Sequence, residues 1–215
     1  MIKIEKSDAP GRITCDADYR NDPVFKCICD DFHGKCYLCE FKSTSYRVEH
    51  IVPRNSNPEL AHDWNNLFLA CPHCNEIKGA KYNNIIDCTK VDPEDVIDVR
   101  FVPFPMAKPE FSSKDADSSL SAQVDQTVEL LNKIFVEPTT AQKFYEADSL
   151  CDALYEEIDH FLDIITNYRK AIGERKKEFR LIVSNHIAKN SAFAAFKRDI
   201  VRKRYYKMFG AELEK

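Results

Sequence analysis

Four cysteines occur in two pairs whose spacing is typical of metal binding. The pairs are C-Y-L-C and C-P-H-C, formed by Cys36 with Cys39 and by Cys71 with Cys74. Two intervening residues let both sulfur atoms of a pair reach one metal ion from a tight turn, and two pairs complete a tetrahedral Zn²⁺ site. Four thiolates leave no open coordination position, so we predict a structural zinc site, with a redox-active dithiol pair as the alternative.

Glu49 and His50 are adjacent and lie between the two cysteine pairs, where they could carry out acid–base chemistry. A carboxylate can bind a hard cation such as Mg²⁺, and a neutral imidazole can take a proton from water near neutral pH. Asn75 follows the last cysteine, and Lys78 comes three residues later on the same face of an expected helix. The start of a helix favours phosphate, whose charge Lys78 could neutralise. This set of residues indicates a metal-dependent nuclease centre.

Short elements must position these side chains. Residues 46–51 suit a β-strand that a proline closes, and residues 67–70 form a second, apolar strand. A helix is expected to begin after a proline and to run from about residue 73 to residue 82. Successive side chains of a strand point to opposite faces, so Glu49 and His50 can share one site only where the strand ends and turns. The zinc site would hold the start of the helix against this strand end.

The motifs E-H-I-V-P, N-N-L-F-L-A-C and C-N-E-I-K-G resemble those of the HNH endonucleases, whose core is a ββα-metal fold. The resemblance covers about 46 residues. It implies that His50 is the general base that activates water, and that Glu49 and Asn75 ligate one Mg²⁺ or Mn²⁺ ion. It also implies that Asn66 braces the loop and orients His50, with Asn65 as a less favoured substitute. The last position of the motif is often His in this family; because it is Asn75 here, the metal preference stays open.

A wider resemblance includes the start M-I-K-I, the motif W-N-N-L, the motif D-x-x-x-V-D-P-E and the helical tail. These features are similar to the HNH component of the Septu and retron-associated antiphage systems. That similarity implies a defence nuclease that acts on nucleic acid, with DNA favoured, and that works with a PtuA-type ABC ATPase. A retron reverse transcriptase/msDNA complex is a further implied partner. Two alternatives remain: an abortive-infection effector that cleaves tRNA or another RNA, and a non-catalytic, zinc-stabilised adaptor.

The composition is that of a globular protein, with 44% hydrophobic and 31% charged residues among 215. A formal net charge of -4 excludes a generally basic nucleic-acid coat protein, so any nucleic-acid site must be a local patch. The start of the chain has no apolar segment typical of a signal peptide, and no apolar run approaches the roughly 18 residues of a membrane span. We therefore predict a cytoplasmic protein without membrane contact, in which the paired Cys-x-x-Cys motifs indicate metal binding more than disulfides.

Charge is segregated along the second half of the chain. Residues 111–165 carry 3 basic and 12 acidic side chains, whereas residues 166–215 carry 14 basic and 5 acidic ones. Either helices attract one another across this asymmetry, or the basic part is a surface for phosphate or for a partner. On the second interpretation, the side chains predicted to contact nucleic acid or a partner are Lys197, Arg198, Arg202, Lys203 and Arg204.

The predicted fold class is α+β, with a small zinc-stapled ββα-metal core and a mainly α-helical second half. The predicted segments are an N-terminal lead-in with a short helix (1–34), the nuclease core (35–110) and a helical, partner-binding region (111–215). A Pro-rich and Ser-rich stretch at about 105–119 is expected to be a linker or domain edge. Apolar residues then recur at helical spacing and predict helices, packed as a bundle, at about 120–135, 140–172, 174–184 and 191–209.

Overall fold

A computed structural model describes the protein at residues 1–15, 18, 21, 23–102, 108–114 and 119–214. Short helices and two strands make up the first part of the chain: α1 (Val24–Asp31), β1 (Arg47–His50), the 3₁₀-helices η2 (Pro58–His62) and η3 (Trp64–Asn66), β2 (Leu67–Ala70) and α2 (Pro72–Lys78). A second pair of strands follows a short helix: α3 (Pro93–Val96), β3 (Ile97–Val102) and β4 (Lys108–Ser113).

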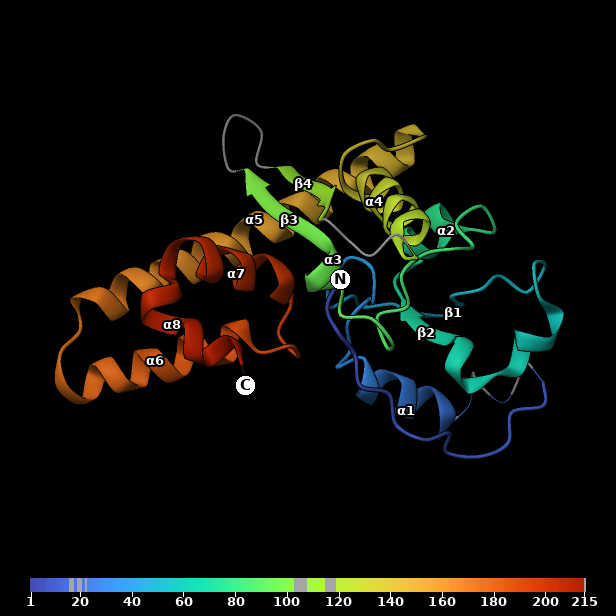
Figure 1. Cartoon of the computed structure of the whole chain (residues 1–215), viewed down its shortest axis with the longest axis horizontal. Helices are drawn as coiled ribbons and strands as arrows, with labels where there is room; N and C mark the ends of the chain where they lie inside the picture. The colour runs from blue at the N-terminus through green and yellow to red at the C-terminus, as the bar shows by residue number, and fades with distance from the viewer. Residues whose placement is uncertain (16–17, 19–20, 22, 103–107, 115–118, 215) are drawn as a thin grey trace.

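Helices form the rest of the chain: α4 (Ser121–Phe135), α5 (Ala141–Lys170), α6 (Gly173–Ile187), α7 (Ala194–Ile200), the π-helix η4 (Val201–Tyr205) and α8 (Tyr206–Leu213). In Figure 1, α1, β1 and β2 lie at one end of the molecule and α6, α7 and α8 lie at the other. The β3–β4 hairpin and α4 lie between these two ends. None of the helices in the described part of the chain is long and apolar enough to cross a membrane.

β1 and β2 pair antiparallel, so that His50 lies opposite Leu67 at one end of the ladder. All four residues of β2 are buried, because its side chains pack between α1 and the cysteine-rich loop. The ring of Phe68 lies 5.3 Å from that of Phe32 and 5.0 Å from that of Tyr37, measured between centroids. The order β1, β2, α2 confirms the predicted ββα arrangement.

α2 is shorter than the sequence suggested. It ends at Lys78, whereas the pattern predicted a helix to about residue 82. The reason lies at Gly79, whose φ of 47° belongs to a region that only glycine enters readily. This stop leaves α2 with seven residues, and its first turn carries the second cysteine pair and Asn75.

The linker expected at about 105–119 is wrong in its described part. Residues 108–113 form β4, which pairs antiparallel with β3 from Ile97 opposite Ser113 to Val102 opposite Lys108. An edge strand of a two-stranded sheet tolerates proline, and the buried ring of Phe111 packs against α4 and α7. The expectation for residues 105–107 and 115–118 lies outside the described residues.

Three of the predicted helices are confirmed as α4, α5 and α6, with ends within three residues of those predicted. Thr140 caps α5 by accepting a hydrogen bond from the backbone of Lys143, and Gly173, with φ of 59°, separates α5 from α6. The last predicted helix (191–209) begins later, at Ala194, because Phe193 has left-handed backbone angles. It also widens into a π-helix at η4, a change that apolar periodicity does not reveal.

The hydrophobic side chains form two clusters. The larger one takes residues from all three predicted segments, among them Ile2, Phe68 and Leu131. The smaller one lies between α5, α6 and α8 and includes Phe161, Val183 and Phe209. The chain therefore passes from strands and short helices to a mainly helical second half, as predicted. The larger cluster joins the strands to most of the helices. The fold class is α+β, as predicted.

Candidate active site and zinc centre

The four paired cysteines converge on one buried point. Their sulfur atoms all lie within 4.8 Å of one another, and those of Cys39 and Cys71 are 3.9 Å apart. A tetrahedral Zn²⁺ ion with bonds of about 2.3 Å needs sulfur atoms about 3.8 Å apart. Each thiol is buried and none forms a disulfide. The residues present therefore fit a structural zinc ion.

Backbone turns bring the cysteines to this point. The first pair lies on a tight turn in which the backbone N–H of Glu40 donates to the carbonyl of Cys36 over 2.9 Å. Glu40 has a positive φ of 61°, and its carboxylate accepts a hydrogen bond of 3.1 Å from the backbone of Ala195 in α7. The second pair begins α2, where the sulfur of Cys71 accepts from the backbone N–H of Cys74.

The electrostatics of this cluster also call for a cation. Burial raises the pKa of the Cys39 and Cys74 thiols well above the usual range. Four thiolates could not coexist in so small an apolar space without a compensating positive charge, which a Zn²⁺ ion would supply. With four protein ligands, such an ion would have no position left for a substrate.

Glu49, His50 and Asn75 line one open cleft of about 530 Å³ at the end of β1. Glu49 and His50 come from the strand and Asn75 comes from α2, so the ββα arrangement brings the predicted side chains together. The zinc cysteines are absent from the residues that line this cleft. The protein thus has a buried cysteine cluster and, separate from it, an accessible cleft with carboxylate, imidazole and amide groups.

The His50 ring is oriented by a carbonyl group. Its Nε2 atom lies 2.9 Å from the carbonyl oxygen of Ala61 in η2, and the side chain is 7% exposed. A carbonyl oxygen only accepts hydrogen bonds, so Nε2 carries a proton in this contact and the neutral ring keeps its lone pair on Nδ1. This is the tautomer that could accept a proton at Nδ1.

Asn66 holds the loop that supplies this carbonyl. Its side-chain amide donates to the carbonyls of Val52 and Leu60, each over 3.0 Å, and its side-chain oxygen accepts from the backbone of Val52 over 2.8 Å. These three bonds fix both ends of the segment between β1 and β2. Asn66 is buried, whereas Asn65 is exposed. Asn66, and not Asn65, therefore makes the contacts that brace the loop.

Lys78 does not occupy the place that the sequence suggested. It is fully buried, and its Nζ donates to Glu49 over 2.7 Å and to the carbonyl of His50 over 2.9 Å. Direct neutralisation of a phosphate by Lys78 is therefore corrected to a positioning role for Glu49 and for the backbone of His50. Burial raises the pKa of Glu49, and the charge of Lys78 opposes that rise.

His73 lies between the zinc cysteines in sequence but is engaged elsewhere. Its Nδ1 is 2.8 Å from a carboxylate oxygen of Glu146, and its Nε2 is 2.9 Å from the carbonyl oxygen of Ile134. Both nitrogen atoms are therefore used in contacts to α4 and α5. This placement explains why His73 does not complete the metal cluster.

The basic tail is only partly a surface. Lys197 and Arg198 are buried, so the prediction that they contact nucleic acid or a partner is wrong. Lys197 pairs with Glu157 over 2.6 Å, and Arg198 pairs with Glu94 over 2.9 Å. Attraction between oppositely charged elements therefore accounts for these two positions.

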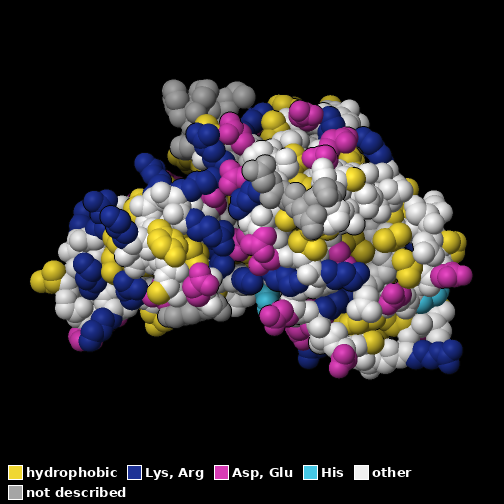
Figure 2. Space-filling model, viewed as in Figure 1, with side chains coloured by type: hydrophobic (Ala, Val, Ile, Leu, Met, Phe, Trp, Pro, Cys, Tyr) yellow, Lys and Arg dark blue, Asp and Glu magenta, His cyan; other side chains and the backbone are white. Residues whose placement is uncertain are grey.

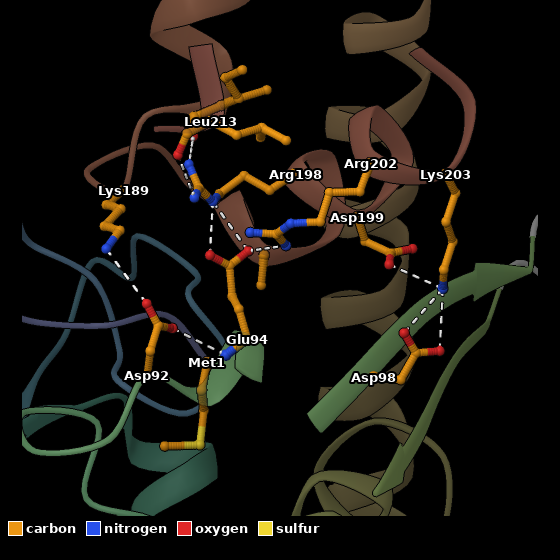
Figure 3. A network of polar contacts seen from close by, with 12 residues as sticks. Met1, Asp92, Glu94, Asp98, Lys189, Arg198, Asp199, Arg202, Lys203 and Leu213 are labelled. Atoms are coloured by element: carbon orange, nitrogen blue, oxygen red, sulfur yellow. Dashed lines mark hydrogen bonds and ion pairs between the residues drawn. The ribbon is translucent and has the colours of Figure 1, made fainter. Parts of the chain in front are cut away.

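The other three tail residues lie nearer the surface. Figure 3 shows the ion pairs that Arg202 and Lys203 form. Arg202 is partly exposed and pairs with Glu94 over 2.6 Å, and Lys203 lies 3.1 Å from Asp98 and 3.0 Å from Asp199. Arg204 is exposed. Figure 2 shows further Lys and Arg side chains spread over the end of the molecule formed by α6, α7 and α8.

Five residues that the sequence reasoning missed also line the cleft: Phe25, Tyr46, Arg47, Val48 and Arg54. A signal was available for Arg47, which is two residues before Glu49 and so lies on the same face of β1. The approach of Phe25 depends on how α1 packs, which no local pattern encodes. Two arginines beside a carboxylate and an imidazole make the cleft suited to a phosphate group.

Comparisons with known proteins agree with this geometry. Residues 36–81 match the family model of the HNH endonucleases. The chain is 35% identical over 72 residues to Septu protein PtuB of Bacillus thuringiensis, a match that covers 30% of this chain and 28% of that relative's length. No solved structure matches the chain. Residues 36–81 thus form an HNH endonuclease domain, and the chain is similar to Septu protein PtuB over 72 residues.

Proposed function

We propose that this protein is a metal-dependent endonuclease that hydrolyses phosphodiester bonds at the cleft of Glu49, His50 and Asn75. The observation that carries the proposal is that these three side chains line one cleft from which the zinc cysteines are absent. A zinc-stabilised adaptor would need only the cysteines. Such an adaptor would not require a carboxylate, an imidazole and an amide to line one cleft.

His50 is the proposed general base, which takes a proton from water at Nδ1 while Ala61 holds Nε2. Among the described residues Glu49 bonds through one carboxylate oxygen, so the other oxygen and the Asn75 amide would hold a cation. Bound Mg²⁺ or Mn²⁺ would supply positive charge to the phosphate. Arg47 and Arg54 would bind phosphate oxygens of the substrate from the cleft wall.

The biological setting is proposed from the similarity to Septu protein PtuB. We infer an effector of an antiphage system that acts with a PtuA-type ATPase and cuts DNA in preference to RNA. A retron reverse transcriptase/msDNA complex as a further partner rests on the resemblance of motifs alone. Cleavage of tRNA is the second candidate, because the proposed chemistry addresses a phosphate that DNA and RNA share.

The test is cleavage of plasmid DNA and of total tRNA by the purified protein with Mg²⁺ or Mn²⁺. The His50→Ala variant is measured beside the wild type at equal zinc content. We expect the wild type to cut plasmid DNA and the variant to be inactive; cleavage of tRNA alone would replace the DNA assignment. If neither protein cleaves either substrate, the assay is repeated with the ATPase partner. Inactivity of the complex, or equal activity of wild type and variant, would overturn the proposal.

A further inference from the structure

Lys6 lies outside the catalytic cleft, and its ammonium binds backbone carbonyls of the turn that leads into β2. Its Nζ donates to the carbonyl of Trp64 and, over 2.6 Å, to the carbonyl of Leu67. The same atom lies 4.2 Å from the centroid of the Trp64 ring and 5.4 Å from that of Phe68. Two charge-assisted hydrogen bonds and two aromatic faces hold this ammonium in one place.

The segment that carries Lys6 is itself anchored. The backbone N–H of Ile4 donates to the carbonyl of Cys88 over 3.0 Å, and the ammonium of Lys3 donates to the carbonyl of Thr89 over 2.8 Å. The indole N–H of Trp64 returns a bond of 2.7 Å to the carbonyl of Ser7. Lys6 therefore connects a fixed segment to the turn at residues 64–67.

This turn matters because it contains Asn66. The two carbonyls that Lys6 binds, those of Trp64 and Leu67, lie on either side of Asn65 and Asn66 in the chain. Asn66 in turn holds the loop that presents the Ala61 carbonyl to His50. Hydrogen bonds linked by short pieces of backbone thus connect Lys6 to the ring of the proposed general base.

We propose that Lys6 is a positioning residue of the nuclease: its ammonium fixes the turn at residues 64–67, and thereby the orientation of His50. This inference rests on the proposed function for its catalytic consequence. A positioning role differs from a purely structural one in its effect on the kinetics. A looser turn would impair proton transfer at His50 before it impaired substrate binding. Substrate binding would depend on Arg47 in β1 and on Arg54 in the segment that follows β1.

The charge of Lys6 gives the inference a measurable pH dependence. Burial lowers the pKa of Lys6 to about 8, and the nearby Asp31, Asp87, Asp63 and Cys88 oppose that shift. The rings of Trp64 and Phe68 add no titrating charge. As the pH rises through about 8, the amine becomes neutral and loses the charge that strengthens both carbonyl bonds and both ring contacts.

The first test uses Trp64, which is the single tryptophan of the chain. Because the ammonium sits over the indole, we expect its fluorescence, excited at 295 nm, to change with a midpoint near pH 8 in the wild type. Lys6→Met should lack the transition. Lys6→Arg, which stays charged, should lack it too. The same midpoint in Lys6→Met would show that another group is responsible and would overturn the inference.

The second test measures single-substrate kinetics of the zinc-loaded proteins. We expect Lys6→Met to lower kcat at least about tenfold at pH 7 with KM nearly unchanged. Lys6→Arg should restore most of the rate and should keep it above pH 8, where the wild type declines. Should Lys6→Met fail to fold, the pH profile of Lys6→Arg decides the question.

The outcomes separate the two proposals. Wild-type kcat in folded Lys6→Met, or an identical alkaline decline in Lys6→Arg, would exclude a positioning role while the nuclease assignment stands. Absence of cleavage by the wild type and its ATPase complex would overturn the proposed function and, with it, the catalytic role of Lys6. The fluorescence titration would then still report whether Lys6 holds the turn.

Discussion

Burial of Glu49 in the cleft opposes the ionisation that metal binding requires. Glu49 lies where burial raises the pKa of its carboxyl group, but it must be ionised to bind a cation. Lys78 resolves the conflict, because its buried ammonium contacts Glu49 over 2.7 Å and favours the ionised carboxylate. The same ammonium binds the carbonyl of His50, so one side chain fixes both predicted catalytic positions.

Replacing Lys78 by Met should therefore harm both stability and activity. Loss of one partner of a buried ion pair costs about 3–5 kcal/mol, and here it also allows the pKa of Glu49 to rise further. We expect a large decrease in the urea midpoint of the zinc-loaded protein and weaker Mn²⁺ binding near neutral pH. Lys81→Met is the matched control, since Lys81 makes an equally short ion pair with Glu129 at the surface. Equal urea midpoints for the two variants would contradict this role of Lys78.

At the scale of single residues, sequence spacing and side-chain chemistry predicted the cysteine cluster and three residues of the cleft, but not which side chains are buried. The cysteine pairs and the positions of Glu49, His50 and Asn75 follow from local motifs, and the structure brings them to a metal cluster and to a cleft. Lys78 was misread because its partner Glu49 lies 29 residues away. Local sequence shows that a lysine can reach a phosphate, but only packing shows that it is buried.

At the scale of elements, the zinc cluster joins the turn at Cys36 and Cys39 to the start of α2. A helix of seven residues has little stability of its own, so its position depends on the metal and on packing. We therefore expect a zinc ion at the cysteine cluster to be required for the cleft, although it would take no part in the proposed chemistry. Asn75 lies one residue after the last cysteine and would move with α2.

Removal of zinc should thus abolish cleavage and loosen α2. We expect a strong chelator, or the Cys39→Ser variant, to increase amide hydrogen exchange across residues 71–79 and to remove activity that added Mg²⁺ does not restore. Exchange in α6 should change little, because α6 packs against α5, α7 and α8. Full activity after verified loss of zinc would refute the structural role of the metal.

Three helices meet at Glu157 of α5. Its carboxylate lies 3.5 Å from Nδ1 of His186 in α6 and 2.6 Å from the ammonium of Lys197 in α7. The close approach of His186 and the hydrogen bond from Lys197 lower the pKa of Glu157 to about 2. A depressed carboxylate pKa stabilises the folded state above the ordinary pKa of about 4.5, and this contribution is lost as pH falls toward 2.

The Glu157→Gln variant should lose this pH dependence. We expect a free-energy difference from wild type of roughly 1–2 kcal/mol at pH 6, after allowance for solvent screening, that shrinks between pH 4.5 and pH 2.5. Urea unfolding at several pH values measures it. Glu156 is the neighbouring residue and is exposed, so Glu156→Gln is the control. Any loss of stability caused by release of zinc in acid should be the same in both variants. A difference that stays constant across this range would disprove the assignment.

Elements with strong periodicity were the easiest to predict. α4, α5 and α6 follow from apolar residues at helical spacing, a cap at Thr140 and a break at Gly173. β4 escaped prediction because Pro109 and its polar neighbours read as a linker, whereas the strand depends on pairing with β3. Local periodicity carries no signal for the π-helix at η4.

At the scale of the whole molecule, a buried ion-pair network connects the C-terminal helices to the first half of the chain (Figure 3). Arg198 donates to both carboxylate oxygens of Glu94 in α3, over 3.0 Å and 2.9 Å. Its remaining N–H groups bind the carbonyls of Ile187 and Leu213, over 3.2 Å and 2.9 Å. One guanidinium thus ties α3, α6, α7 and α8 together.

Arg198→Met should therefore destabilise the protein as a whole. Among the described residues, the variant leaves the buried Glu94 with Arg202 as its remaining charged partner, and two carbonyls lose their donor. We therefore expect a loss of about 3 kcal/mol or more. Arg100→Met removes an exposed, 3.7 Å pair with Glu110 and should cost less than about 1 kcal/mol. Equilibrium urea unfolding compares them, and similar losses would argue against the network.

The central claim is that His50, and not the cysteine cluster, activates water in the cleft. Chemical rescue tests this claim most directly: single-turnover cleavage by zinc-loaded His50→Gly is measured with and without added imidazole. The account predicts a rate about 10²–10⁴-fold below that of the wild type, restored in part by imidazole and not by additional zinc. A His50→Gly protein that cuts at the wild-type rate with zinc in place would contradict it.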